Sequence, residues 1–173
     1  PKIDIHIEDS LGRSWQIATI QLDFQMSERF QLNYVDEKGK KRKSVIIHRA
    51  IFGSFERFVG ILAEHYGGNF PLWLAPFQIW IIPVSKKHRK FAQKIGKGFQ
   101  DMDFRFEVKD LNETVSKKIR DGELQKIPYL LVVGDKELKE KSVRVRKRGK
   151  GDIGIMKLNK FTEKIKKEIE KKL

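Results

Sequence analysis

The sequence has no cysteine among its 173 residues. That absence excludes disulfide bonds and thiol catalysis, and it fits the reducing environment of a cytoplasmic protein. No run of 18 or more apolar residues is present, so the sequence predicts no membrane-spanning helix and no membrane partner. No secretory signal pattern stands at Pro1, and we expect the chain to begin inside a longer protein.

Acidic residues are outnumbered, with 23 Asp and Glu against 37 Lys and Arg, which gives a formal net charge of +14. Such an excess favours a polyanionic partner, and nucleic acid before a membrane, because no basic amphipathic segment carries a convincing insertion face. A lysine-rich, solvated surface is the alternative interpretation. The hydrophobic content of 39% is enough for one or two small packed domains.

The stretch 44–68, SVIIHRAIFGSFERFVGILAEHYGG, predicts a strand that runs into a helix. The β-branched run 45–47 is typical of a strand covered on both faces. Ser54 suits the N-cap, and the glycine pair 67–68 suits the helix end. The helix start carries partial positive charge and suits an anion. Arg57 lies in that first turn, where a cation is unfavourable. A bound phosphate would explain its presence there, and an ordinary surface arginine is the alternative.

The string IHRAIFGSFERF and its continuation to LWLAP resemble motif 3 of class II aminoacyl-tRNA synthetases, most closely the threonyl-tRNA synthetase version. The resemblance runs from near Pro1 to the C-terminal helix. Motifs 1 and 2 of the family and its amino-terminal editing region are not in the chain. The resemblance therefore implies the end of a catalytic domain, residues 1–74, followed by an anticodon-binding domain, residues 75–173. Pro71 and Pro76 mark a packed connector, and we place the boundary near 74–76.

Alternation of apolar and polar residues predicts an antiparallel sheet in the first domain. The expected strands lie at 3–7, 15–24, 30–35 and 44–47, with a turn at 9–13 and a charged hairpin at 36–43 that has Gly39 at its tip. In the strand 15–24 we expect the even-numbered residues from Ala18 to Phe24 to form a core face. Thr19, Gln21 and Asp23 then form a polar face, which is either solvated or lines a site.

The resemblance implies that this polar face lines a site. WQIATIQLDF matches the segment that lines the ATP and threonine pocket of threonyl-tRNA synthetases, and Gln16, Thr19 and Gln21 fall on matching positions. Gln16 has the opposite parity, so all three face one pocket only if the strand bends or bulges between them. The resemblance also implies Ser54 in this pocket. Arg57 would be catalytic and hold the ATP phosphates, and Mg²⁺ would neutralise their remaining charge.

A single His such as His48 is ordinarily a packed or hydrogen-bonded residue. Zinc needs about four ligands, and the chain offers no Cys and no second His at ligand spacing. The resemblance implies that His48 matches the last of the one Cys and two His that hold Zn²⁺ in threonyl-tRNA synthetases. That zinc binds the amino group and the hydroxyl of threonine. Valine lacks the hydroxyl, so the site rejects it. The other two ligands would lie upstream, so we expect these residues alone to hold no zinc tightly.

Beyond residue 78 strands and helices alternate in the order βαβαββα. We expect strands at 78–84, 104–108, 129–133 and 142–148, and helices at 86–102, 114–127 and from 159, where Asn159 is the cap and Phe161, Ile165, Ile169 and Leu173 form one stripe. This order predicts right-handed crossovers and a largely parallel sheet with helices on both faces. The fold class is therefore α/β and α+β, and the second domain matches the mixed five-stranded anticodon-binding domain of class IIa synthetases.

The segment 139–150, KEKSVRVRKRGK, holds seven basic residues and one acid. Its arginines 144, 146 and 148 share one predicted strand face, where guanidinium groups pair with phosphates and bases; a solvated face is the alternative. The resemblance implies three anticodon readers, Asn112, Glu137 and Arg146, for the G and U at the second and third positions. Such groups read splayed bases. Thr114 stands where bacterial relatives often carry Lys. Arg144, Lys147 and Arg148 are expected general RNA contacts.

Two functions remain in view. The first is threonine–tRNA ligase, which activates threonine with ATP and transfers it to tRNA(Thr). In that case the full enzyme would be a homodimer, and the present residues alone would be inactive. The second is a stand-alone, non-catalytic RNA-binding or regulatory module that reuses the fold. The intact Gln16, Gln21, His48 and Arg57 favour the ligase. The two differ in whether motifs 1 and 2 are encoded upstream.

Overall fold

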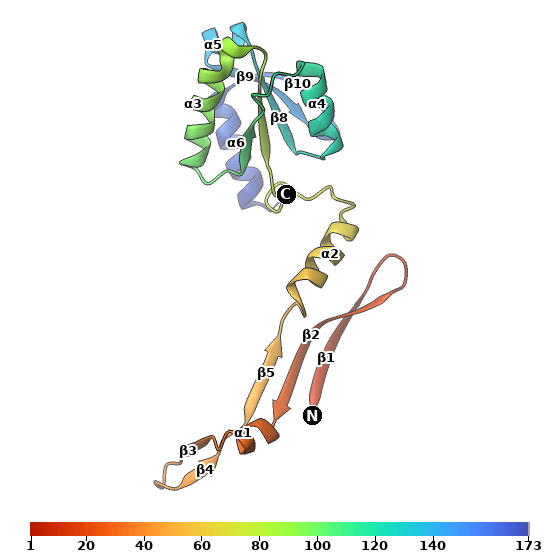
Figure 1. Ribbon diagram of the computed structural model, residues 1–173, viewed down its shortest axis with the longest axis vertical. Helices are drawn as coiled ribbons and strands as arrows, with labels where there is room; N and C mark the ends of the chain where they lie inside the picture. Colours follow the sequence, from red (N-terminus) through yellow and green to blue (C-terminus); the bar gives the residue numbers. More distant parts are fainter. Residues whose placement is uncertain (173) are drawn as a thin grey trace. The chain divides into compact units, whose positions relative to one another are not determined.

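The computed structural model describes residues 1–172, and the chain divides into two compact units, Pro1–Gly67 and Gly68–Leu173 (Figure 1). The predicted boundary near 74–76 lies inside the second unit. The connector belongs to that unit because Leu72 and Ala75 are buried. In addition, the Arg105 side chain donates hydrogen bonds to the carbonyl oxygens of Trp73 and Ala75.

Unit 1 is built on a three-stranded antiparallel sheet in the order β1-β2-β5. The strands are β1 (Lys2–Glu8), β2 (Ser14–Asp23) and β5 (Ile46–Ala50). The charged hairpin is a separate pair, β3 (Asn33–Val35) and β4 (Lys41–Lys43), and Gly39 at its tip has a φ of +73°. A short helix, α1 (Gln25–Arg29), was not predicted; the Asp23 side chain accepts a hydrogen bond from the Met26 N–H at its start.

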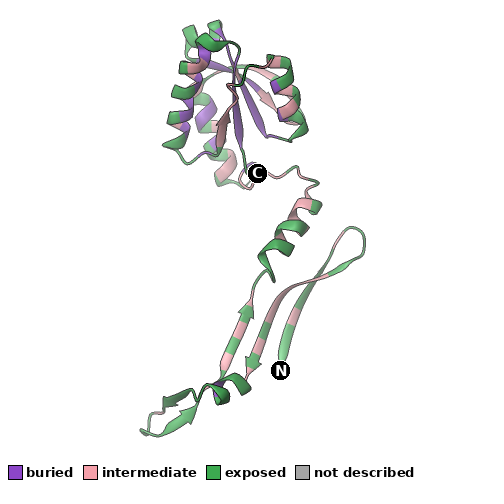
Figure 2. Cartoon of the chain, viewed as in Figure 1, coloured by how far each residue is buried: buried purple, intermediate pink, exposed green. Residues whose placement is uncertain are grey.

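The apolar face of this sheet is exposed, contrary to the prediction of a core face on β2 and of a strand 45–47 covered on both sides. Ile3 lies opposite Ile20, and Leu22 lies opposite Ile47, so these side chains share a face. Their exposed fractions are 37% or more, and Ser27 alone is buried in residues 1–67 (Figure 2). Alternation predicts which face needs cover, but no second layer covers it within unit 1.

Helix α2 (Phe55–His65) follows β5 as predicted. The Ser54 hydroxyl accepts a hydrogen bond from the Arg57 N–H at 3.3 Å, which confirms the N-cap. Gly67 and Gly68 both have positive φ, which confirms the glycine stop. Gly53 also has a positive φ, +64°, at the bend that joins strand and helix, and that bend aims the first turn of α2 at β2.

Unit 2 contains a mixed five-stranded sheet in the order β10-β9-β8-β6-β7. The strands β6 (Ile79–Pro83), β7 (Phe106–Val108) and β8 (Tyr129–Val133) are parallel, whereas β9 (Ser142–Lys147) and β10 (Gly151–Lys157) are antiparallel. The fold class is confirmed, but β10 and the short helix α5 (Asp135–Glu140) were not placed from the sequence. The register of β10 shifts between Asp152 and Gly154, and such glycine-rich sequences lack a strand signature.

Helices cover both faces of this sheet, as predicted (Figure 1). The 3₁₀ turn η1 (Lys86–His88) leads into α3 (Arg89–Gln100), which packs with α6 (Leu158–Glu170) over a core that contains Phe99, Phe161 and Ile165. Helix α4 (Val115–Leu124) covers the other face, which is built on Trp80, Ile82 and Leu130. Residues 1–172 contain no helix that could span a lipid bilayer.

One detail of the helix predictions is wrong. Lys157 is the N-cap of α6, and Asn159 lies inside its first turn, because the backbone turns helical two residues earlier than the side-chain preference suggested. In α4, Val115 and Ile119 pack against the core, whereas Leu124 at the end of the helix is 67% exposed. The last member of the predicted α6 stripe, Leu173, lies outside the described residues.

Candidate functional site

A β-bulge brings Gln16 onto the polar face of β2. Ile5 lies opposite Ala18 and His6 lies opposite Gln16, so the pairing skips residue 17. The Gln16 Nε2 atom donates to Asp4 Oδ1 at 2.8 Å, and the Thr19 hydroxyl donates to the same oxygen at 2.7 Å. The predicted irregularity is confirmed, and it is what lets side chains of opposite parity meet.

Asp4, where these two side chains meet, was not identified from the sequence. Its carboxylate also forms an ion pair with Lys2 at 2.6 Å. The hydrogen bond from Lys2, followed by that from Thr19, lowers the pKa of Asp4 below its ordinary value. The usable signal was the alternation of β1, which puts Asp4 on the polar face, but only the strand register reveals that it lies opposite Thr19.

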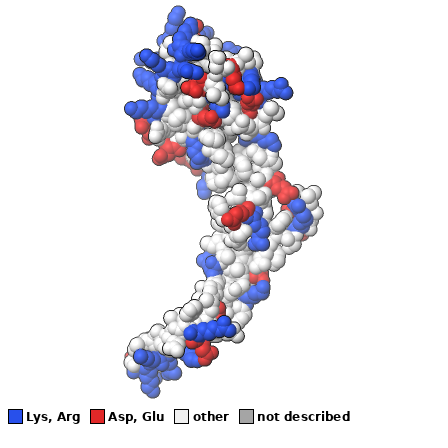
Figure 3. Space-filling view, viewed as in Figure 1, with Lys and Arg blue, Asp and Glu red and all other residues white. Residues whose placement is uncertain are grey.

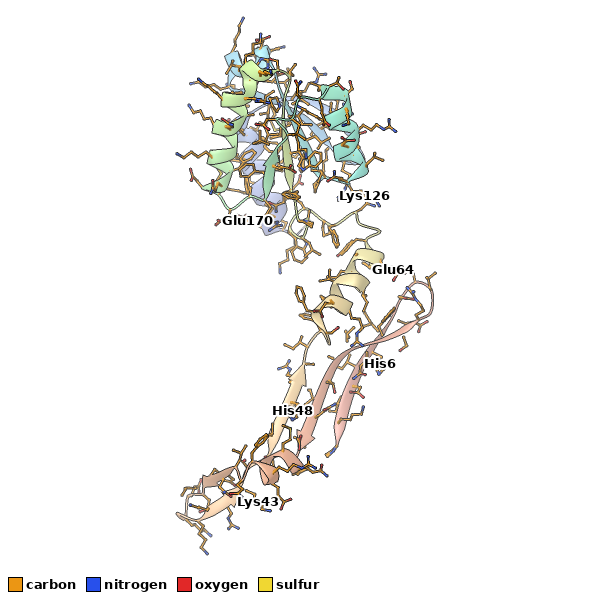
Figure 4. All side chains as sticks on the ribbon, in the orientation of Figure 1. His6, Lys43, His48, Glu64, Lys126 and Glu170 are labelled. Atoms are coloured by element: carbon orange, nitrogen blue, oxygen red, sulfur yellow. The ribbon has the colours of Figure 1, made fainter. Side chains whose placement is uncertain are left out.

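His48 and Gln21 extend the polar face. They are directly paired between β5 and β2, and Thr19 lies two residues along from Gln21 on the same side. The His48 side chain extends from β5 (Figure 4). Its Nε2 atom is 3.2 Å from Asp23 Oδ2. The Met26 backbone N–H, followed by His48, lowers the pKa of Asp23. His48 lies in the middle of β5, whereas the predicted strand ended at residue 47.

The polar face does not by itself fit a zinc ion. In the described residues, no three His, Asp or Glu side chains are placed together where they could hold a metal. Since a protein zinc site needs three or four ligands, His48 with Asp23 beside it is insufficient. No step of a reaction can be derived through zinc from this chain.

Arg57 contacts the backbone of β2, the strand that carries Gln16 and Thr19. Its terminal guanidinium nitrogen donates to the backbone carbonyl oxygen of Gln16 at 3.0 Å. Ser54, the other predicted residue in this turn, uses its hydroxyl to cap α2. Hydrogen bonds therefore link Arg57, Gln16 and Thr19 into one group through Asp4, and pairing with β5 adds Gln21 and His48 to the same face.

The three arginines of the basic segment in unit 2 have different partners. Arg144 donates to Asp152 at 2.7 Å and Arg146 donates to Glu123 at 3.0 Å. Arg148 lies beyond the end of β9 and donates to the backbone carbonyl oxygens of Lys126, Asn69 and Phe70. Arg148 ties the connector to the domain through these backbone contacts. Burial lowers its pKa.

Lys147, a predicted RNA contact, lies on the opposite side of β9 from Arg146. Its Nζ atom is 3.1 Å from the Glu168 carboxylate and 5.2 Å from the centre of the Tyr129 ring. Burial, followed by the hydrogen bond to Glu168, raises the pKa of Tyr129. Consecutive residues of a strand point to opposite faces, so Lys147 and Arg146 cannot contact one RNA segment across a single sheet face.

Asn112 and Glu137 lie near the same edge of the sheet. Asn112 follows β7 in the loop before α4, and Glu137 lies in the first turn of α5, directly after β8. The buried Glu137 carboxylate accepts a hydrogen bond from the Gly134 N–H at 2.9 Å. Thr114 caps α4 by accepting from the Lys117 N–H. Arg146 lies opposite Leu130, three residues before β8 ends, so it is set back from this edge.

Basic side chains are prominent on the visible face of unit 2 in Figure 3, whereas the acidic ones are fewer and scattered. This distribution agrees with the excess of Lys and Arg in the sequence. A positive surface suits the phosphates of a nucleic acid. The arginines on β9 and the residues near the ends of β7 and β8 stay the sequence-predicted candidates for RNA binding.

Comparisons with known proteins agree with both halves of this description. Residues 78–168 match the family model of the anticodon binding domain, and residues 1–66 match that of the class II tRNA synthetase core domain (G, H, P, S and T). The threonine–tRNA ligases of Desulforamulus reducens and Carboxydothermus hydrogenoformans are 52% and 54% identical over 172 residues. Each alignment covers 99% of this chain and 27% of the relative.

The crystal structure of the RNA binding domain of threonyl-tRNA synthetase from Cryptosporidium parvum Iowa II superposes with a TM-score of 0.82 at 37% identity. The match covers 96% of this chain and 42% of that one. The chain thus spans about a quarter of the length of the curated relatives it matches. It belongs to the class II aminoacyl-tRNA synthetases, and within them to the threonyl-tRNA synthetase family, with core-domain residues in unit 1 and the anticodon-binding domain in unit 2.

Proposed function

We propose that this chain works as part of a threonine–tRNA ligase, which activates threonine with ATP and transfers it to tRNA(Thr). The observation that carries the proposal is the grouping of Gln16 and Thr19 on the polar face of unit 1, with Gln21 and His48 along the same face and Arg57 hydrogen-bonded to the backbone of Gln16. A packing role would not require these polar groups to gather. The family membership of the chain adds the reaction class to this grouping.

In this proposal each group on the face has a distinct task. Arg57 stabilises the negative charge that develops on the ATP phosphates as threonine displaces pyrophosphate. Gln16, Thr19 and Gln21 supply amide and hydroxyl groups that orient threonine and the nucleotide. Asp4 keeps Gln16 and Thr19 in place through its shared oxygen. Mg²⁺ binds largely through phosphates and water, so the ATP phosphates beside Arg57 would bring it to the site, where it neutralises charge.

Unit 2 would supply tRNA recognition. Asn112, Glu137 and Arg146 offer an amide, a carboxylate and a guanidinium, the groups that read the edges of unstacked bases in a single-stranded loop. The proposed targets are the G and U at the second and third anticodon positions. The full enzyme would act in the cytoplasm as a homodimer, and His48 would join a zinc site completed by residues outside this chain.

The test uses the full-length protein that contains this sequence. Threonine-dependent exchange of pyrophosphate into ATP, followed by threonylation of tRNA(Thr), is the expected result. The 173 residues alone should bind an anticodon stem-loop of tRNA(Thr) without exchanging pyrophosphate. The alternative result is that the full-length protein binds the stem-loop but shows no pyrophosphate exchange with any amino acid. That result would contradict the ligase and favour the non-catalytic RNA-binding module.

A further inference from the structure

Helix α4 carries a buried lysine, Lys118, that belongs to none of the candidate sites. The residue is 4% exposed, and within residues 1–172 its ammonium group forms no hydrogen bond and no ion pair. Among the unpaired side-chain nitrogens of the same residues, those of Trp80 and Arg146 are cut off from solvent, whereas that of Lys118 is not. The alkyl chain is therefore buried while the ammonium group still reaches solvent, where a ligand can contact it.

The ammonium group of Lys118 faces one edge of the sheet. Arg89, at the start of α3, and Lys109, directly after β7, repel its positive charge. Asp110 and Glu113, in the loop that leads to α4, attract it. Because β6 and β7 are parallel, α3 and α4 both begin at the edge where these strands end. The charged groups around Lys118 therefore come from the carboxyl end of the sheet.

Two of these neighbours form ion pairs of their own. Glu113 pairs with Lys117, the exposed residue that precedes Lys118 on α4. Lys109 pairs with Glu107 at 2.9 Å. The carboxylate of Glu113 is thus held by another ammonium group, and the charge of Lys109 is offset by its own partner.

Outside these pairs, Arg89, Asp110 and Lys118 contribute two cations and one carboxylate. The Arg89 guanidinium donates to the backbone carbonyl oxygen of Asp110. Burial lowers the pKa of Lys118, which agrees with an ammonium group whose charge is poorly compensated. A bound anion would supply the missing hydrogen-bond acceptor and offset the surplus positive charge.

Asn112 indicates which anion this edge would meet. It lies in the same loop, between Asp110 and Glu113, and is a proposed reader of an RNA base. Each base of an RNA loop is joined to a backbone phosphate, and Lys and Arg side chains are the usual partners of such phosphates. An RNA phosphate next to the base at Asn112 is therefore the anion that would be brought to Lys118.

We propose that Lys118 and Arg89 bind a backbone phosphate of the RNA at the carboxyl end of β7 and thereby position the neighbouring base for Asn112. The proposal rests on the proposed function of unit 2 in binding the anticodon loop. A phosphate contact of this kind fixes the position of the RNA and carries no sequence information. The sequence gives no sign of it, since Lys117 and Lys118 are adjacent and only the fold shows that the second is buried.

The test replaces the ammonium group of Lys118 with an apolar group of similar length. Lys118→Met is compared with Lys90→Met, because Lys90 follows Arg89 on α3, is exposed and has no ion-pair partner within residues 1–172. The 173-residue chain is titrated with the anticodon stem-loop of tRNA(Thr) and with the same RNA carrying other bases at the second and third anticodon positions. A further set of intact loops carries one neutral methylphosphonate at each loop position in turn.

Lys118→Met should weaken binding of the two unmodified RNAs by the same factor, roughly tenfold to a hundredfold, the range for one hydrogen bond to a charged group. Lys90→Met should change each affinity by roughly twofold or less. One methylphosphonate position should weaken binding by the wild type and leave Lys118→Met unaffected, because the variant has already lost that contact.

The same variant should not lower the free energy of unfolding, since methionine removes a buried charge. Urea unfolding followed by circular dichroism measures this, and Lys118→Gln is the second variant if Lys118→Met does not fold. A loss of affinity no larger than that of Lys90→Met overturns the role of Lys118. A loss confined to the loop with the G and U also overturns it, because Lys118 would then contact a base.

The methylphosphonate loops give a separate check. If no loop position weakens the wild type more than Lys118→Met, Lys118 binds no phosphate and the proposal is overturned. A wild type that binds neither stem-loop overturns the RNA-binding function of unit 2 itself. The failure of the phosphate site and the failure of the proposed function are thereby distinguished.

Discussion

The guanidinium of Arg57 donates a hydrogen bond of 3.0 Å to the backbone carbonyl oxygen of Gln16, 41 positions earlier in the chain. The contact joins the first turn of α2 to β2. Gly53 makes room for it, because a Cβ atom at this position would lie 2.5 Å from the Arg57 terminal nitrogen. A backbone acceptor fixes the guanidinium without neutralising its charge, so the charge remains available to an anionic ligand.

Arg57→Ala in the full-length enzyme should lower threonine-dependent pyrophosphate exchange strongly. The expected loss is about 2.7–4 kcal/mol of transition-state stabilisation, which is the usual cost of removing one preorganised donor at developing charge. The measurement is the rate of exchange at saturating ATP and threonine. Arg42→Ala, in the β3–β4 hairpin where Arg42 pairs with Asp36, is the control and should leave the rate unchanged. A near-normal rate for Arg57→Ala would remove it from the mechanism.

The 173-residue chain should hold no stoichiometric zinc. Within residues 1–172, the possible second ligand at hydrogen-bonding distance from His48 is Asp23, and two ligands do not bind zinc tightly. The measurement is metal analysis of the purified chain after dialysis against zinc-free buffer. His48→Ala serves as the control and should give the same background. One firmly bound zinc per chain that is lost in His48→Ala would contradict the prediction.

Local patterns in the sequence predicted much of the fold. The Ser54 cap, the glycine stop after α2 and the layered βα units of the second domain follow from short-range preferences, and the structure confirms each of them. Strand β10 was missed because its glycines and its shifted register carry no alternation. The sequence also did not predict that the apolar face of unit 1 is exposed. Alternation of apolar and polar residues shows which face of a sheet is apolar, but it does not show whether a second layer packs against that face.

The candidate site was predictable only in part. The parity argument required a bulge between Gln16 and Thr19, and the structure has one. The partners of the site residues could not be predicted in the same way, since Asp4 and Glu123 are far in sequence from the residues that they contact. Arg148 shows the limit of periodicity: β9 ends one residue before it, and the side chain turns to backbone carbonyls.

Two glycines of helix α3 should respond oppositely to alanine. A Cβ on Gly96 would lie 2.6 Å from the Phe106 ring, whereas a Cβ on Gly98 would meet no atom within 4 Å. Gly98→Ala should therefore raise the free energy of unfolding of unit 2 by about 0.5–1 kcal/mol, because alanine loses less backbone entropy in a helix. Gly96→Ala should lower it by about 1–3 kcal/mol through overpacking. Urea unfolding followed by circular dichroism measures both, and equal effects would contradict the packing of α3 on β7.

Arg146→Ala should distinguish base reading from phosphate binding. With the anticodon stem-loop of tRNA(Thr) the change should cost about 1–3 kcal/mol of binding free energy, the range for a good bidentate base contact. With a stem-loop in which the G and U at the second and third anticodon positions are replaced, the change should cost much less. The replacement bases form poorer hydrogen bonds with the guanidinium, so less binding free energy is lost with it. The measurement is a binding titration against both RNAs at two salt concentrations.

Lys150→Ala is the matched control for Arg146→Ala. Lys150 is exposed in the turn between β9 and β10, close in sequence to Arg146, and in the described structure its ammonium group has no ion-pair partner. A phosphate contact carries no sequence information, so Lys150→Ala should weaken both RNAs equally and reduce the salt slope by about 1. Equal weakening of both RNAs by Arg146→Ala would make Arg146 a phosphate contact as well.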